Sequence, residues 1–167
     1  MLVPGRNAGF ELAVNAYFND LYRFAYWLCR NRWQAEDLVQ ESLVRAWRGW
    51  HGLRDERAVK VWLFTIVRRE FHRAVSRAAR PEPLTDPDDL AISADMASGM
   101  DLTRALRDLP DDSREALLMQ VLGGFSCSEI ASALGASEGA VMTRLTRARQ
   151  VLRRRLDPAD ARAVRQA

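Results

Sequence analysis

The stretch SCSEIASALGASEGAVMTRLTRARQVLRRRL, residues 126–156, decides the fold of this 167-residue chain. Ser126 predicts a helix N-cap, and Glu129, three residues later, completes a capping box. Gly135 stands where a left-handed residue ends a helix, and Ser137 offers a second N-cap. Two helices joined by a tight turn, the second rich in arginine, are typical of a helix-turn-helix and point to DNA. On this stretch alone, a plain helical hairpin with a solvated basic face stays open as the alternative.

The second helix of this motif has apolar residues at helical spacing. They predict one buried stripe, formed by Val141, Leu145, Ala148, Leu152 and Leu156. Because the N-terminal part of the second helix enters the major groove, residues there that face away from the stripe are candidates for base contact. These are Met142, Thr143, Thr146 and Arg147. The later arginines suit phosphates, which position a protein without reading sequence.

Composition bounds the function only loosely. The chain has 25 Lys+Arg against 22 Asp+Glu, a formal net charge of +3, so the distribution of charge matters more than its total. No apolar run is long enough to cross a membrane, and the N-terminus lacks a signal-peptide pattern; both predict a cytoplasmic protein without membrane insertion. Cys29 and Cys127 are expected to be reduced and buried. They do not form a zinc site with His51 and His72 by spacing, so we expect neither a metal nor a cofactor.

Helical periodicity without a convincing strand signal predicts an all-α fold. We expect two small helical domains joined by a flexible linker, the C-terminal domain containing the helix-turn-helix. The linker is residues 80–99, RPEPLTDPDDLAISADMASG, because its prolines break helices and its aspartates keep it solvated. The domains are therefore residues 1–79 and 100–167. The helices expected outside the helix-turn-helix cover about residues 8–30, 34–50, 58–78, 100–109 and 110–122.

The second predicted helix has two different faces. We expect its inward face to consist of Ala35, Leu38, Val39, Leu43, Ala46 and Trp47. The other face presents Asp37, Gln40, Glu41 and Val44. An apolar residue among acidic and amide groups fits a docking patch for a basic partner, and it equally fits a solvated face with one stray valine.

The third predicted helix carries a basic strip. Its polar side gathers Thr65, Arg68, Arg69, His72, Arg73 and Ser76. Trp62 lies at the edge of the strip and is expected to be mostly core, with its ring edge reachable. A basic strip bordered by an aromatic ring suits single-stranded or distorted DNA, because arginines follow phosphates and rings stack on exposed bases.

Four segments together resemble a family. They are AEDLVQESLVRAW (35–47), WLFTIVRREFHRAVSR (62–77), LPDDSREALLMQ (109–120) and SEIASALGASEGAVMTRLTRARQVLRRRL (128–156). In this order they resemble a bacterial sigma factor of the extracytoplasmic-function (ECF) type, in the sigma-70 family. The resemblance covers nearly the whole chain, and the pairing of AEDLVQE with RLTRARQVLR is far more specific than a helix-turn-helix alone.

The resemblance implies three surfaces and no catalysis. The AEDLVQE helix would dock on the clamp helices of the largest subunit of core RNA polymerase, which favours docking over a solvated face. That docking set is Asp37, Gln40, Glu41 and Val44. Residues implied in taking and melting the minus-ten promoter element and holding a flipped base are His51, Arg54, Arg57, Lys60, Trp62, Arg68, Arg69, His72 and Arg73. Residues implied in reading the minus-thirty-five element are Ser137, Gly139, Ala140, Met142, Thr143, Arg144, Thr146, Arg147 and Arg149.

The resemblance also implies partners, and three residues of this chain differ from the pattern common in the family. The partners would be core RNA polymerase, through its clamp helices and flap, promoter DNA, and an anti-sigma factor. The linker would pass near the RNA exit path. Arg69 stands where family members often have asparagine, Ala140 where they often have threonine, and Met142 where a basic residue is common, so we expect an unusual promoter.

Two other functions compete with this interpretation. A stand-alone helix-turn-helix regulator that binds duplex DNA needs no docking helix, so AEDLVQE argues against it. A nuclease would need organised carboxylates. Asp86, Asp88 and Asp89 lie in the predicted linker with no histidine or lysine nearby, so the sequence shows no metal site and we do not expect an enzyme.

Overall fold

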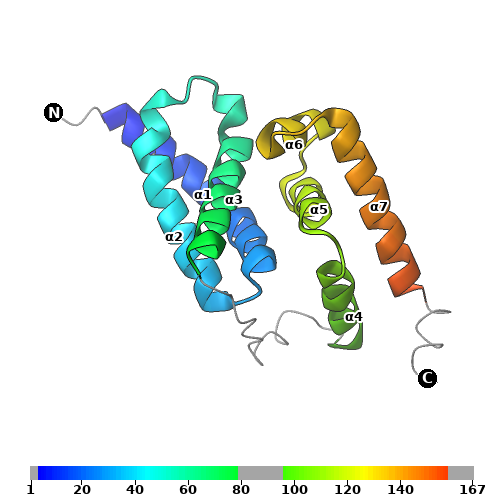
Figure 1. Ribbon diagram of the computed structural model, residues 1–167. Coiled ribbons are helices and arrows are strands. Elements are labelled where there is room, and N and C mark those ends of the chain that lie inside the picture. Colours follow the sequence, from blue (N-terminus) through cyan, green and yellow to red (C-terminus); the bar gives the residue numbers. More distant parts are fainter. Residues whose placement is uncertain (1–3, 79–95, 158–167) are drawn as a thin grey trace.

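The structure, a computed structural model, describes residues 4–78 and 96–157, and within these ranges it is helical, with no strand (Figure 1). The helices form two groups that lie side by side. We call α1–α3 the first module and α4–α7 the second module. The predicted linker, residues 80–99, lies outside the described residues except for its last four, and the tail beyond Asp157 lies outside them too.

The first module packs three long helices around an aromatic centre. It contains α1 (Pro4–Cys29), α2 (Arg32–Gly49) and α3 (Val59–Arg77), with two short 3-10 helices, η1 (Trp50–Gly52) and η2 (Glu56–Ala58), between α2 and α3. Phe24 of α1 and Phe64 of α3 are both 0% exposed, and their ring centroids lie 4.9 Å apart. Leu21 and Leu63 extend this core. Apolar residues one helical turn apart explain why these helices bury one face each.

The second module contains α4 (Met96–Arg107), α5 (Asp111–Gly123), α6 (Cys127–Leu134) and α7 (Glu138–Leu156). The last two form the predicted helix-turn-helix. Its local signals are confirmed, because Ser126 and Glu129 form a complete capping box and Gly135 adopts a left-handed φ of 62°. Ser137 caps α7 by accepting a hydrogen bond from the N–H of Ala140 at 3.1 Å.

Several sequence expectations need correction. Trp47, expected inside, is 39% exposed. Ser42, which was not expected inside, is buried, and its hydroxyl is satisfied by donating to the carbonyl of Leu38 at 2.6 Å. Leu156, expected in the buried stripe of α7, is 42% exposed because it is the last residue of the helix. The fourth helix begins at Met96 rather than Met100, within the predicted linker.

Further differences are smaller. Cys29 and Cys127 are half-buried rather than buried, and both are free thiols, as expected. Burial raises the pKa of the Cys29 thiol to about 12. The other helix ends differ from the expected ones by a few residues, as helix ends commonly do. The fold itself, two helical modules ending in a helix-turn-helix, is confirmed.

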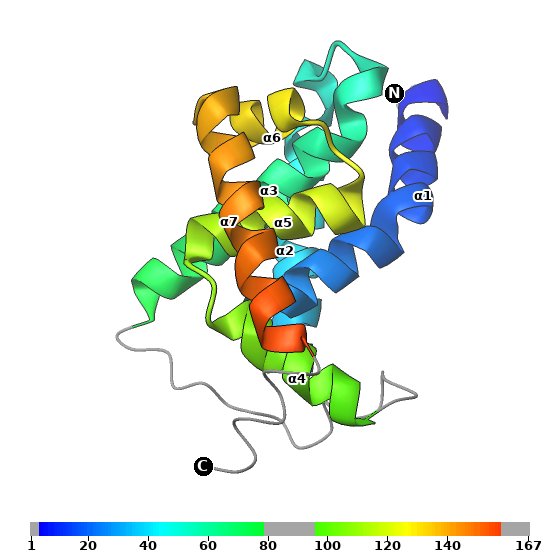
Figure 2. The same ribbon diagram turned by 90° about the vertical axis from the view of Figure 1, so that its right-hand side faces the viewer.

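The two modules are packed together. Helix α5 contacts α1 and α3, and α6 contacts α3, while α7 lies on the outer side of α5 (Figure 2). Phe125 is 6% exposed and places its ring edge-on against Phe64, with 4.9 Å between centroids. Gly123 and Gly124 precede this ring, and Gly124 has a left-handed φ of 71° that ends α5. The turn before the helix-turn-helix therefore places an aromatic side chain in the core of the other module.

Candidate nucleic-acid interface

Helix α2 presents the predicted docking set to solvent. Asp37, Gln40 and Glu41 are exposed, and Val44 is 52% exposed. The inward positions of the helix are Ala35, Leu38, Val39, Ser42 and Ala46. The amphipathic pattern therefore turns the acidic and amide residues, with one valine, away from the module core.

Trp33 extends this face and was missed by sequence reasoning. It is 65% exposed and lies four residues before Asp37, so it stands one turn earlier on the same side of α2. The guanidinium of Arg32 lies 5.6 Å from its ring centroid. The spacing from Trp33 to Asp37 and Gln40 was the available signal. A large exposed aromatic beside carboxylates strengthens the interpretation of this face as a protein-docking surface.

The segment between α2 and α3 is ordered by short-range hydrogen bonds. The side chain of Asp55 accepts from the N–H of Arg57 at 3.0 Å, and the N–H of Leu53 donates to the carbonyl of Trp50 at 3.2 Å. These bonds hold His51, Arg54 and Arg57 exposed on the surface. The predicted minus-ten residues of this segment are thus accessible to a ligand.

Lys60 is placed differently from its neighbours. Its ammonium pairs with the carboxylate of Asp20 at 3.0 Å and lies 5.6 Å from the ring of Tyr17. It also lies 5.9 Å from the ring of Phe125 in the second module. Lys60 is therefore engaged within the protein, unlike the exposed cations of the loop before it.

A cavity of about 290 Å³ lies between the end of α2 and α3, bordered by Trp62. Trp62 is half-buried, as expected for a core residue with a reachable edge. Its ring centroid lies 6.2 Å from that of Trp50. Four arginines line the cavity with it: Arg45, Arg48, Arg69 and Arg73. One aromatic ring and several guanidinium groups around a cavity suit a base and its phosphate.

Glu70 orders two of these arginines. It is 3% exposed, and its Oε1 pairs with Nε of Arg45 at 2.6 Å and with Nη1 of Arg73 at 3.0 Å. A buried carboxylate is stable only with such partners. Sequence reasoning did not single out Glu70, although it lies three residues after Val67 on the buried side of α3, and that spacing was the available signal.

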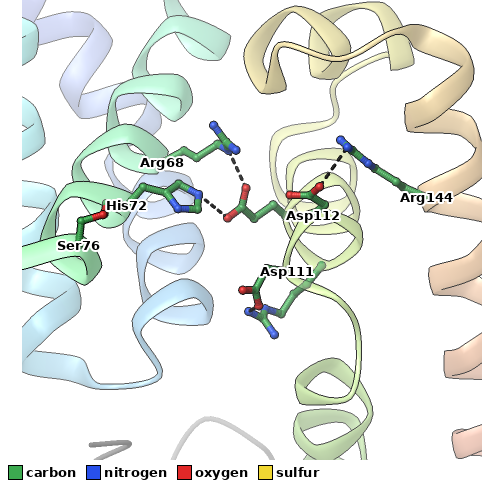
Figure 3. A network of polar contacts seen from close by, with 8 residues as sticks. Arg68, His72, Ser76, Asp111, Asp112 and Arg144 are labelled. Carbon is green, nitrogen blue, oxygen red and sulfur yellow. Dashed lines mark hydrogen bonds and ion pairs between the residues drawn. The ribbon is translucent and has the colours of Figure 1, made fainter. Parts of the chain in front are cut away.

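The basic strip of α3 divides into two sides. Arg69 and Arg73 border the cavity beside Trp62. Arg68 and His72 instead point toward the second module, where both contact Glu115 of α5 (Figure 3). A second, open cavity of about 480 Å³ runs along this strip toward Ser76 and Arg77. Within this strip, Arg68 and Arg73 are paired with buried carboxylates, whereas Arg69 is exposed.

Helix α7 presents its predicted reading residues outward. Met142 is 58% exposed, and Thr143, Thr146 and Arg147 are exposed as well. The two threonine hydroxyls donate to backbone carbonyls one turn earlier, at 3.0 and 2.9 Å. Their oxygens remain as outward acceptors, because a hydroxyl has two lone pairs besides its proton.

The remaining predicted residues of this set are less free. Ser137 is exposed but its hydroxyl caps the helix, Gly139 is exposed and Ala140 is half-buried. Arg144 pairs with Asp112 of α5 at 3.0 Å (Figure 3), and Arg149 donates a hydrogen bond to Gln120. The structure therefore separates arginines that brace α7 against α5 from Arg147, which has no ion-pair partner among the described residues.

Two kinds of site were not found in the part of the chain that the structure describes. No three histidine, cysteine or carboxylate side chains there are grouped to hold a metal ion. None of the helices there combines the length and apolar character needed to span a membrane. Asp86, Asp88 and Asp89, the carboxylates considered for a nuclease, fall outside the described residues.

Residues 13–81 match the family described as Sigma-70 region 2, and residues 99–152 match Sigma-70, region 4. The chain is also 32% identical over 157 residues to the ECF RNA polymerase sigma factor SigM of Mycobacterium tuberculosis, covering 92% of this chain and 80% of that protein. The chain belongs to the ECF sigma factors of the sigma-70 family. Sigma factors are transcription initiation factors, not enzymes, in line with the expectation that the chain catalyses no reaction.

Other relatives of this sigma factor agree. It is 34% identical over 151 residues to the ECF RNA polymerase sigma factor SigE of Mycolicibacterium smegmatis, covering 84% of this chain but only 58% of SigE. Its structure is similar to that of the sigma factor RpoE of Bartonella quintana, solved in complex with the anti-sigma factor NepR. The TM-score is 0.72 at 28% identity, covering 89% of this chain and 97% of RpoE.

Proposed function

We propose that this sigma factor binds core RNA polymerase and directs it to promoters through three separate surfaces. The observation that carries the proposal is that one chain has both an exposed acidic face on α2 and a helix-turn-helix, in segments that match regions 2 and 4 of the family in order. A stand-alone DNA-binding regulator has no use for the α2 face. In this proposal the protein acts in the cytoplasm, where polymerase and DNA are.

The docking surface is the α2 face formed by Asp37, Gln40, Glu41 and Val44, to which the structure adds Trp33. Its carboxylates suit a basic helical surface on the clamp of the polymerase, and its apolar residues supply contact area. The accessibility of all five residues supports this assignment.

The minus-ten surface is the segment from His51 to Arg57 together with the basic strip of α3. The cavity bordered by Trp62, Arg69 and Arg73 is suited to an unstacked base with its phosphate. Lys60, Arg68 and His72 belong to this set by sequence, yet in this structure they contact residues of the protein itself. They would become available only after rearrangement.

The minus-thirty-five surface is the outer face of α7. Met142, Thr143, Thr146 and Arg147 are the residues that would reach base edges in the major groove. Arg144 and Arg149 would contribute after exchanging Asp112 and Gln120 for phosphates. Ala140 and Met142 offer an apolar surface where family members often present a hydroxyl and a basic group, so we expect a distinctive promoter element.

An anti-sigma factor is the expected regulator. RpoE of Bartonella quintana, which this sigma factor resembles over both modules, was solved with the anti-sigma factor NepR. A protein that covered the α2 face or the basic strip of α3 would block the surfaces that initiation requires. We therefore propose that this sigma factor, too, is held inactive by such a partner.

Run-off transcription tests the proposed function directly. Purified core polymerase with this sigma factor should give discrete transcripts from fragments of the source genome, and core polymerase alone should not. The proposal would be wrong if the isolated chain bound duplex DNA tightly and sequence-specifically but had no effect on transcription by core polymerase. That result would favour a stand-alone regulator.

A further inference from the structure

Glu115 is the most completely buried charged residue of the contact between the two modules. It is 1% exposed and lies on α5 of the second module. Both of its oxygens are taken by α3 of the first module, since Oε2 lies 2.6 Å from Nε of Arg68 and Oε1 lies 2.7 Å from Nε2 of His72 (Figure 3). Both side chains that contact this carboxylate thus come from the other module.

The two partners of Glu115 are proposed promoter-binding residues. A carboxylate offers guanidinium and imidazole groups the same pair of anionic oxygen acceptors that a phosphate offers. The side chain of Arg68 is only 19% exposed while it is paired. Glu115 therefore takes the Nε–H of Arg68, and the burial of the paired side chain restricts the approach of a DNA phosphate to its other N–H groups.

We propose that the second module inhibits the first within the same chain, with Glu115 occupying on Arg68 and His72 the place of a promoter phosphate. In the free sigma factor, Arg68 and His72 are then unavailable to minus-ten DNA until the modules separate, while the cavity beside Trp62 stays accessible. This inference rests on the proposed function of α3, and its test is chosen so that the two can fail separately.

Phe125 supplies a second anchor for the closed form. Its ring meets Phe64 at an interplanar angle of 86°, an edge-on geometry that aromatic pairs favour. Lys60, another proposed promoter residue, has its ammonium 5.9 Å from the same ring. The closed form thus engages three proposed minus-ten residues through two side chains of the second module.

Like charges oppose this closed form at another point of the contact. Burial lowers the pKa of Arg30 in the first module, and the positive charges of Arg107 and Arg114 in the second module lower it further. A contact with an aromatic ring stabilises Arg30 there, since its guanidinium carbon lies 4.7 Å from the centroid of the Trp27 ring. Attraction at Glu115 and repulsion at Arg30 make the closed form reversible, as a regulatory contact requires.

The test uses the full-length chain with Glu115→Gln, which keeps the shape of the side chain and removes its charge. Two properties are measured without polymerase: the radius of gyration by small-angle X-ray scattering, and binding to a fluorescein-labelled single-stranded DNA of mixed sequence by anisotropy. We expect the radius of gyration to increase and the affinity to rise roughly tenfold, within the range typical of coupling between two sites.

Glu70→Gln is the matched control. Glu70 is also buried and also pairs with two cations, one of them on α3, but both partners lie within the first module. This variant should keep the radius of gyration of the natural chain. Glu115→Lys, which places a like charge opposite Arg68, should open the chain at least as far as Glu115→Gln. Cooperative thermal unfolding by circular dichroism establishes that each variant is folded.

Two results would overturn the inference in different ways. If folded Glu115→Gln and Glu115→Lys both stay as compact as the natural chain and bind DNA no better, there is no inhibitory contact. If they open but bind DNA no better, Arg68 and His72 do not bind DNA, and the assignment of α3 fails as well. Run-off transcription with Arg68→Ala holoenzyme decides that assignment independently.

Discussion

Gly123 leaves room for the ring of Phe125. A Cβ at this position would lie 2.2 Å from Cε2 and 2.4 Å from Cδ2 of that ring, far inside van der Waals contact. The ring itself cannot move away easily, because it is 6% exposed and packed against Phe64. The glycine is therefore required by packing, whereas the neighbouring Gly124 is favoured by its left-handed φ.

Gly123→Ala should destabilise the protein by about 1–3 kcal/mol, the usual cost of forcing extra volume into a packed site. Urea unfolding followed by circular dichroism measures it. Gly139→Ala is the matched control, because Gly139 also lies in a helix and nothing stands within 4 Å of its Cβ position. That variant should be neutral or slightly stabilising, since alanine favours a helix. Equal stability of the two variants would contradict the packing role.

At the scale of single helices, α2 and α7 each separate a buried stripe from an exposed face with a proposed binding role. On α2 the exposed face is acidic and includes Val44 and Trp33; on α7 it is polar and basic. Because neither face supports the core, substitutions there should change binding and leave the fold intact.

Asp37→Arg combined with Glu41→Arg should abolish binding to core polymerase, because two carboxylates become cations opposite a basic surface. The free energy of unfolding should stay within about 0.5 kcal/mol of that of the natural chain. Co-purification with core polymerase measures the effect. Glu11→Arg, which reverses an exposed carboxylate on α1, is the control and should bind normally. Normal co-purification of the double variant would rule out this face as the docking site.

Arg147→Ala should weaken promoter binding by holoenzyme at least about fivefold, the lower limit for loss of a good base contact. Arg155→Ala, near the end of the same helix, should have a smaller effect, because Arg155 pairs with Asp108 at 2.9 Å and is far from the reading positions. Filter binding or anisotropy with holoenzyme and promoter DNA distinguishes the two. A larger loss for Arg155→Ala would move the reading surface toward the end of α7.

Features of these helices that depend on neighbours in sequence were predictable. The capping box of Ser126 and Glu129, the left-handed Gly135 and the cap by Ser137 all follow from local hydrogen bonding. The inward position of Trp47 was predicted wrongly. Its ring packs on the ring of Phe10, 5.1 Å away, at the edge of the module and not in its centre. Helical periodicity predicts which side of the helix a side chain lies on, and tertiary packing decides how deeply that side chain is buried.

At the scale of the whole molecule, the contact between the modules could not be predicted. In LPDDSREALLMQ, Glu115 has the pattern of an ordinary helix carboxylate, and its burial depends on Arg68, 47 residues earlier. Arg68 and His72 do lie together on α3, where both contact Glu115, yet the division of the strip between the Trp62 cavity and the second module depends on long-range packing. The same holds for Phe125, whose position depends on α3.

Arg107→Gln tests the repulsion between the modules. Removing one of the charges that face Arg30 should stabilise the chain by about 0.5 kcal/mol, the size of a surface like-charge interaction. Arg104→Gln, an exposed arginine of the same helix, is the control and should be neutral. Thermal unfolding of both variants under identical salt checks this. If Arg107→Gln is no more stable than Arg104→Gln, the arginines do not oppose the contact.

Because Arg68 and His72 touch Glu115 and are also proposed promoter contacts, their identity would set two properties at once. A sigma factor redesigned at these positions to accept another promoter would also hold its own second module more tightly or more loosely. Its background transcription without a signal would therefore change with its target sequence. Independent sigma factors built from this chain would need changes in α5 together with α3. A new α3 alone would no longer match Glu115 of α5.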